Sequence, residues 1–312
     1  MNNVISVVAP VFALIAIGYV AGRLRWISDI GAKGLAEFTF SLAIPAMLFR
    51  KMATAELPDV TPYALWGAYF GSAIAIWVIA TFTTVFVLRR TAAEAASISM
   101  SASFSNVVMI GMPLSLNLYG EAAAAPIAII ISLHSPLLWT IASIHVGLSR
   151  NDGNLSFAAI GRDIADELSR NLIILSIIAG TLWRLSGLGF DPLADDIITL
   201  VGQAGIPCAL VSLGLSLVGF RIAGQIPTLS TILLLKIVVM PLVAWLVAFH
   251  VFALSPVAAG VVTIFAAMPT GANAYLFAAR NNLAPHSASG SVALGTCLSA
   301  IAAAFVIFAL KP

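Results

Sequence analysis

The stretches that decide this fold are SNVVMIGMP, residues 105–113, and MPTGANA, residues 268–274. Each places proline, glycine and asparagine inside a segment that is otherwise apolar enough to cross a bilayer. Lipid offers no partner to a freed backbone N–H or C=O, so such breaks persist only where protein or water meets these groups. Two breaks, one in each half of the chain, predict a solute site near the midplane of a transporter.

The composition predicts a polytopic membrane protein. Of 312 residues, 61% are hydrophobic and 9% are charged, and the mean hydropathy is +1.05. A spanning helix needs roughly 20 apolar residues. Windows of that length predict ten spans, at 4–22, 34–50, 62–88, 92–118, 122–148, 170–188, 195–219, 227–250, 256–279 and 286–310. We therefore expect an all-α membrane protein.

The distribution of lysine and arginine between the predicted spans indicates orientation, because basic residues are enriched on the cytoplasmic side. If both termini lie outside, the cytoplasmic side receives Arg23, Arg25, Lys33, Arg89, Arg90, Arg150, Arg162, Arg170, Arg221 and Arg280. The outside then receives Arg50, Lys51, Arg184 and Lys311. This bias predicts that both termini lie outside. The net charge of +2 follows from topology and implies no nucleic-acid partner.

The chain reads as a duplication. A shift of 162 residues places Ile44-Pro45-Ala46 on Ile206-Pro207-Cys208, Gly18 on Gly180, and residues 106–113 on 268–275. Five spans per half, an odd number, require the second half to enter from the opposite side, which is an inverted repeat. We predict repeats at 1–150 and 170–312, with the interrupted fourth and ninth spans crossing. The cytoplasmic linker at 151–169 is either a short amphipathic helix or a plain connection.

The breaks carry the candidate binding groups. A half-helix that begins in the membrane presents unsatisfied N–H groups with a partial positive charge, which attracts carboxylates. Asparagine amides can donate to an anion, glycines let the backbone approach, prolines free carbonyls, and hydroxyls add further donors. The candidate substrate-binding residues are Ser103, Ser105, Asn106, Gly111, Pro113, Pro269, Thr270, Gly271 and Asn273.

Other marked residues have a structural interpretation beside the functional one. Pro45 and Pro207 predict repeat-related bends in the second and seventh spans. Lys236, inside a span, either snorkels to the interface or compensates charge at the crossing, by pairing with a solute carboxylate or with helix C-terminal dipoles. His134 either carries a proton or is a neutral histidine that bonds a neighbouring helix.

The residues resemble the auxin efflux carrier family of plants and bacteria. Asn106 with Gly111-Met112-Pro113, and Met268-Pro269-Thr270-Gly271, look like that family's crossover motifs. The Ile44–Phe49 stretch, Lys236 and Pro241 also fit. The similarity extends over the whole chain, and it marks Asn106, Pro113 and Pro269 as crossover residues. Asn273 lies in a break whose pattern differs from the first.

The resemblance implies a fold and a mechanism. Ten helices with both termini outside are expected, consistent with the orientation deduced from charge. The resemblance also implies a plasma membrane, with a bacterial inner membrane favoured. A dimerising scaffold of spans one, two, six and seven would support a mobile domain of spans three to five and eight to ten, which moves as an elevator. Members carry organic anions: auxin in plants, and dicarboxylates such as malonate or malate among bacterial relatives. The implied partners are a small organic anion, the bilayer and a second copy of the chain, and no metal or cofactor is expected.

Two other classes stay open. A sodium-coupled symporter of the bile-acid carrier type would share a five-plus-five crossed fold but would need a cluster of oxygen ligands, and only Asn, Ser and Thr are available near the breaks. A membrane-embedded enzyme would need a metal or nucleophile constellation. The sequence shows no His-Glu-x-x-His and no aspartate-rich pair motif. We therefore expect a carrier of small organic anions and not an enzyme.

Overall fold

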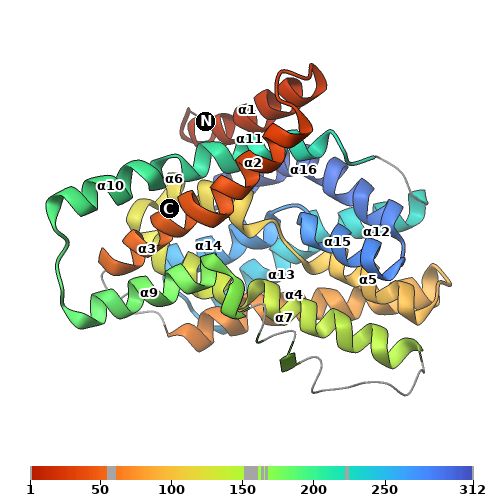
Figure 1. The fold of residues 1–312 in the computed structure, drawn as a ribbon. Coiled ribbons are helices and arrows are strands. Elements are labelled where there is room, and N and C mark those ends of the chain that lie inside the picture. Colours follow the sequence, from red (N-terminus) through yellow and green to blue (C-terminus); the bar gives the residue numbers. More distant parts are fainter. Residues whose placement is uncertain are drawn as a thin grey trace. The chain divides into compact units, whose positions relative to one another are not determined.

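The computed structural model describes residues 2–54, 61–150, 161–162, 165, 168–221 and 225–310. Within these ranges the backbone is helical apart from turns, short connections and one isolated bridge (Figure 1). Most of the predicted linker at 151–169, including its amphipathic pattern, and Lys311 lie outside the described residues.

Seven described helical stretches are long and apolar enough to cross a membrane, which is consistent with the predicted polytopic protein. Two shorter apolar helices, Leu172–Ser186 and Pro256–Ala267, accompany them. The stretch Val107–Ser149 has 43 residues, or about 65 Å at ~1.5 Å per residue, which is twice the ~30 Å hydrocarbon core. Gly120, at φ +61°, turns the chain within it. The number of ten spans and the inversion of the repeat stay predictions.

The chain divides into two compact units, each drawn from both halves of the sequence. Unit 1 comprises Met1–Asp59, Val108–Ser132 and Asp166–Gly219, and unit 2 comprises Val60–Val107, Leu133–Ala165 and Phe220–Pro312. The chain passes from unit to unit within the π-helix η3 (Val107–Gly111) and within α7 (Ala124–Arg150). Each unit is described by itself below.

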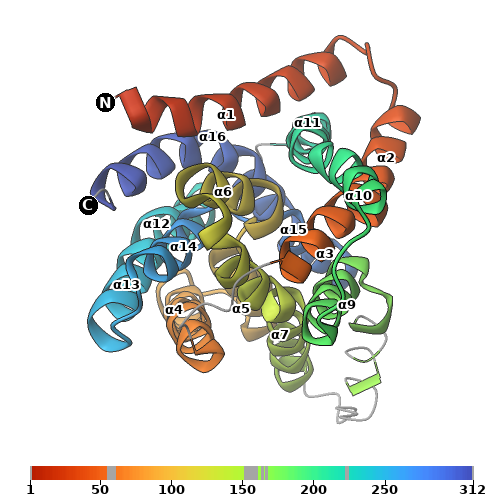
Figure 2. The ribbon, with the colours of Figure 1, turned by 90° about the vertical axis from the view of Figure 1, so that its left-hand side faces the viewer.

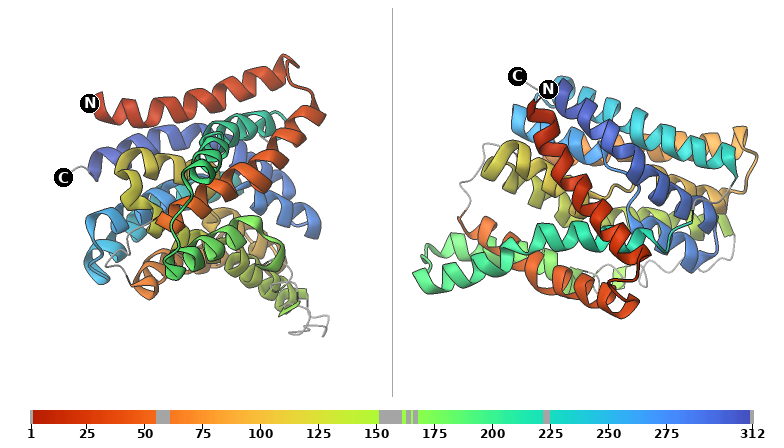
Figure 3. Two further views of the ribbon diagram at one scale, coloured as in Figure 1. Left: turned by 60° about the vertical axis from the view of Figure 1, so that its left-hand side comes forward. Right: turned by 90° about the horizontal axis from the view of Figure 1, so that it is seen from above.

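Unit 1 is built from helices of both halves. Its elements are α1 (Asn2–Arg23), α2 (Asp29–Phe38), η1 (Thr39–Ala43), α3 (Ile44–Thr54), α6 (Met112–Tyr119), η4 (Gly120–Ala123), α9 (Leu172–Ser186), α10 (Pro192–Gln203) and α11 (Gly205–Leu217). Helix α1 packs on α11, and α3 packs on α9. The red α1 crosses the teal α11 in Figure 3.

Two glycines in unit 1 let these helices approach closely. A Cβ on Gly18 would overlap the carbonyl oxygen of Val211, and a Cβ on Gly180 would overlap that of Phe49. The two contacts are related by the same offset, because Gly180 is 162 residues after Gly18 and Val211 is 162 residues after Phe49. The packing of unit 1 therefore follows the offset found in the sequence.

The predicted bends have local backbone causes. In the second span the π-helix η1 separates α2 from α3, and Pro45 is the second residue of α3. In the seventh span the α10–α11 junction falls at Ala204, and Pro207 is the third residue of α11. A proline inside a helical run removes one backbone hydrogen bond, and its ring crowds the preceding turn. The regular α-helix is interrupted just before each of these prolines, and the bends themselves stay predictions.

Unit 2 holds the remaining helices. Its elements are α4 (Pro62–Phe82), η2 (Thr83–Val87), α5 (Ala92–Ser103), α12 (Ile226–Leu234), η5 (Leu235–Val239), α13 (Met240–Leu246), η6 (Val247–Val251), α14 (Pro256–Ala267), α15 (Ala272–Asn281) and α16 (Pro285–Ala309), with most of α7. Helix α13 packs beside α14 and α4 (Figure 2). Helix α16 packs on α12 and α14.

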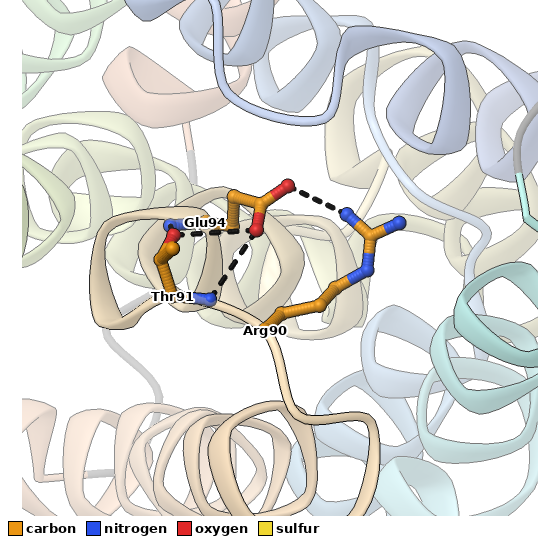
Figure 4. A network of polar contacts seen from close by, with 3 residues as sticks. All are labelled: Arg90, Thr91 and Glu94. Atoms are coloured by element: carbon orange, nitrogen blue, oxygen red, sulfur yellow. Dashed lines mark hydrogen bonds and ion pairs between the residues drawn. The ribbon is translucent and has the colours of Figure 1, made fainter.

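A capping box fixes the start of α5, whose other end carries a break. The Thr91 Oγ1 accepts a hydrogen bond from the Glu94 amide at 3.2 Å, and the Glu94 carboxylate accepts one from the Thr91 amide at 3.3 Å (Figure 4). Arg90 pairs with the same carboxylate at 2.7 Å. Two orphan N–H groups are satisfied at once, so α5 begins at a defined residue.

Candidate functional site

The second break lies where the sequence predicts it. Helix α14 ends at Ala267, residues 268–271 are non-helical, and α15 begins at Ala272 with Gly271 as its N-cap residue. All four non-helical residues are buried. Pro269 cannot donate to a helical ladder, so the helix cannot run through.

The first break is shorter than the predicted 105–113 stretch. Helix α5 ends at Ser103, residues 104–106 are non-helical, and the backbone is helical again from Val107 through η3 and α6. Gly111 is the last residue of η3, and Pro113 sits in the first turn of α6. Because η3 runs directly into α6, Pro113 removes one backbone hydrogen bond inside a helical run that continues through it.

The two breaks pair with each other inside unit 2. Ser105 and Thr270 form an antiparallel bridge. The Asn106 amide donates to the Pro269 carbonyl at 2.8 Å, and the Gly271 amide donates to the Phe104 carbonyl at 3.0 Å. Each break thereby supplies the backbone partners that the other lost, as a buried interruption in an apolar protein requires.

Gly271 is required by the closeness of this pairing. A Cβ there would lie 2.9 Å from Cδ1 of Phe104 and 3.3 Å from the Ser105 carbonyl oxygen. The Phe104 ring is itself held against His134, with 4.4 Å between centroids. A larger residue at 271 would therefore push the two breaks apart.

The C-terminal end of α5 is satisfied by a side chain from the other break. Thr270 Oγ1 donates to the Ser101 carbonyl at 2.8 Å, with both residues buried. Ser103, also buried, donates to the Ser99 carbonyl of its own helix at 2.7 Å. In this arrangement the hydroxyls of Thr270 and Ser103 both donate to backbone carbonyls of α5.

Lys236 meets the C-terminal end of α14. The residue is 0% exposed and lies in η5. Its Nζ donates to the Ala266 carbonyl at 2.8 Å, to Ser105 Oγ at 2.7 Å and to Met240 Sδ at 3.0 Å. The ammonium thus compensates the negative end of a half-helix dipole, one of the alternatives left open by the sequence, and it does not snorkel.

His134 supports the first break from α7. Its Nε2 lies 3.0 Å from the Ser105 carbonyl oxygen, and because a carbonyl only accepts, Nε2 carries the proton. The side chain is 3% exposed and its ring lies 5.6 Å from that of Tyr69. Ser105 is therefore held through its carbonyl by His134 and through its hydroxyl by Lys236.

The N-terminal end of α15 is the place suited to an anion. Gly271 has no side chain to cap this helix, and in the described part of the chain the Ala272 and Asn273 amides donate no hydrogen bond. Both residues are half-buried. Asn106, only 7% exposed, is tied by its backbone to Pro269, two residues before the N-cap. Partial positive charge and amide groups thus gather beside the paired breaks.

The structure brings together most of the predicted residues. Ser105, Asn106, Pro269, Thr270, Gly271, Lys236 and His134 are joined by the contacts above. Gly111 and Pro113 follow in helical backbone of unit 1, as Pro45 and Pro207 do at the bends. In the described ranges, no group of three or more His, Cys, Asp or Glu side chains could hold a metal ion.

Sequence reasoning missed four groups at the site. They are the Ser101 and Ala266 carbonyls and the rings of Tyr69 and Phe104. The carbonyls are visible only once the helix ends are known, since any of the last four residues can supply one. An aromatic residue in an apolar span carries no distinguishing signal.

Comparison with known proteins relates this chain to membrane transporters. The family described as "Membrane transport protein" matches residues 3–307. A protein of Rhizobium meliloti (strain 1021) named "Putative malonate transporter" is 24% identical over 314 residues, covering 100% of this chain and 97% of that protein. "Uncharacterized transporter YfdV" of Escherichia coli (strain K12) is 23% identical, covering 91% of this chain and 90% of that protein.

A partial similarity reaches a eukaryotic protein. The "Lysosomal cholesterol signaling protein" of Mus musculus is 28% identical over 109 residues, which is 35% of this chain and 13% of that protein. The full-length relatives carry names of transporters and not of enzymes. With the match over residues 3–307, the resemblance seen in the sequence is confirmed, and the chain belongs to the membrane transport protein family, the auxin efflux carrier family.

Proposed function

We propose that this membrane transporter is a secondary carrier of small organic anions. The observation that carries the proposal is the buried pairing of two helix breaks, Ser105 with Thr270, beside the uncapped start of α15 and the cation of Lys236. A carboxylate is the ligand that such a helix start and its amides favour. The relative named for malonate supports a small carboxylic acid as the solute class.

The solute carboxylate is held by the first amides of α15 and by Asn106, with Asn273 assisting. Glycine at 271 lets the first break lie against the start of α15, because a Cβ there would meet the Phe104 ring. Gly111 and Pro113 start the half-helix that follows the first break. Ser103, Ser105 and Thr270 act through the backbone that they hold in place.

Alternating access follows an elevator scheme in this proposal. A scaffold of spans one, two, six and seven, which dimerises, supports a moving domain of spans three to five and eight to ten. The contact units support part of this division: α1, α2, α3, α9, α10 and α11 fall in unit 1, and α4, α5 and α12 to α16 fall in unit 2. Helix α6 and the start of α7, which belong to spans four and five, group with unit 1 instead. In this proposal the carrier lies in the plasma membrane with both termini outside.

The test is uptake of radiolabelled weak acids, malonate and malate among them, into proteoliposomes. Asn106→Ala should lose most uptake while the protein purifies and reconstitutes as wild type does. Asn117→Ala, in an exposed position on α6, is the matched control and should transport normally. Undiminished uptake by Asn106→Ala would remove Asn106 from the binding site.

The same assay separates the carrier classes. Uptake that continues when sodium is replaced by choline is expected for an anion carrier without sodium coupling. Strict dependence on sodium would instead favour a symporter of the bile-acid carrier type.

A further inference from the structure

All donors of the Lys236 ammonium are engaged within the protein. An ammonium offers three N–H groups and no acceptor. Three acceptors surround Nζ: Ser105 Oγ at 2.7 Å, the Ala266 carbonyl at 2.8 Å and Met240 Sδ at 3.0 Å. No N–H group is therefore left over for a solute carboxylate in this arrangement.

The acceptors join the two breaks. Ser105 belongs to the first break, and Ala266 lies in the last turn of α14, just before the second. Both oxygens carry partial negative charge, and the Ala266 carbonyl adds the negative end of the α14 dipole. Both oxygens are buried and need a donor, because an unpaired buried acceptor is costly, and the Lys236 ammonium donates to both.

Lys236 is buried away from acidic side chains and from solvent. Among the described residues no carboxylate forms an ion pair with it, and its side chain is completely buried. It emerges from η5, a π-helical turn of a kind that recurs at functional sites. The positive charge is thus matched by the dipole and the hydroxyl and not by an acidic side chain.

We infer that Lys236 is a positioning residue, a cation tethered to the chain that does at the paired breaks what a bound metal cation would otherwise do. It holds the α14 end to Ser105 and so keeps the solute-binding backbone in place without a diffusible ion. The part of this inference that concerns transport rests on the proposed function and predicts uptake that needs no sodium. The part that concerns protein stability does not rest on it, because Lys236 makes its contacts without solute.

Thermal unfolding of the purified protein in detergent, without solute, tests the tethered cation. Lys236→Ala removes three methylene carbons and the ammonium, so n-propylammonium is the matched fragment. We expect Lys236→Ala to lower the Tm by about 3–10 °C, since two buried acceptors lose their donor. Millimolar n-propylammonium should restore part of this shift, and tetramethylammonium, which has no N–H, should not. Lys33→Ala, at an exposed position, should respond to neither.

A second variant decides the matter if Lys236→Ala does not fold. Lys236→Met replaces all of the side chain but its terminal atom and removes its charge and donors. It should lower the Tm without rescue by n-propylammonium, because most of the space stays filled. A Tm and uptake equal to wild type in Lys236→Met would overturn the inference. Equal restoration of the Lys236→Ala Tm by n-propylammonium and tetramethylammonium would also overturn it, as would a sodium requirement for wild-type uptake. If the wild-type protein shows no anion uptake while n-propylammonium still restores the Tm of Lys236→Ala, only the proposed function is overturned.

Discussion

Thr270→Val isolates the contribution of one hydroxyl to the pairing of the breaks. Thr270 Oγ1 donates to the Ser101 carbonyl at 2.8 Å, and the residues are 0% and 1% exposed. Valine keeps the branched shape and removes the donor. Because α5 ends at Ser103, the Ser101 carbonyl has no helical amide to replace it. Leaving a buried carbonyl without a partner costs about 1–3 kcal/mol.

Thr263→Val is the matched control for this prediction. Thr263 is also buried in unit 2 and donates at 2.8 Å, but to the Ala259 carbonyl of its own helix. That carbonyl keeps its helical partner, so the loss should stay below about 1 kcal/mol. Thermal unfolding in one detergent would compare the two, with Thr270→Val lower in Tm by about 2–10 °C. Equal Tm values for both variants would refute the reasoning that Thr270 closes the end of α5.

Two further substitutions test the close approaches of the backbone. Gly271→Ala places a Cβ 2.9 Å from the Phe104 ring and should lower both the Tm and the uptake. Its control, Gly71→Ala, lies in open space on α4 and should leave both unchanged. A Gly271→Ala variant with wild-type Tm and uptake would show that the breaks can move apart. Gly18→Ala drives a Cβ into the Val211 carbonyl between α1 and α11. It should lower the free energy of unfolding by about 1–3 kcal/mol. A variant as stable as wild type would argue against the close approach of these two helices.

The breaks were predictable because their chemistry is local. The second break follows the sequence closely, since Pro269 lies within it and Gly271 caps the next helix. The sequence extends the first break to residue 113, although only residues 104–106 are non-helical, because Gly111 and Pro113 are residues that usually interrupt helices. In the structure Pro113 follows the π-helix η3 without a gap, and the helical backbone continues through it. The position of a proline in its helix decides its effect, and the composition of a span does not reveal that position.

The partners of Lys236 and His134 could not be predicted because they are distant in sequence. Lys236 reaches Ala266, 30 residues on, and Ser105, 131 residues back. His134 reaches Ser105 across 29 residues. A single sequence indicates that an ionisable group in a span needs a partner. It does not indicate which carbonyl becomes free at a helix end that forms only in the folded protein.

The central claim is that the solute carboxylate binds at the start of α15 beside Asn106. The most direct measurement is an experimental structure with the acid that gives the strongest uptake. We expect carboxylate density within about 2.7–3.2 Å of the Ala272 and Asn273 amides and in contact with the Asn106 side chain. Density for the acid at any other place in the protein, with this helix start empty, would contradict it.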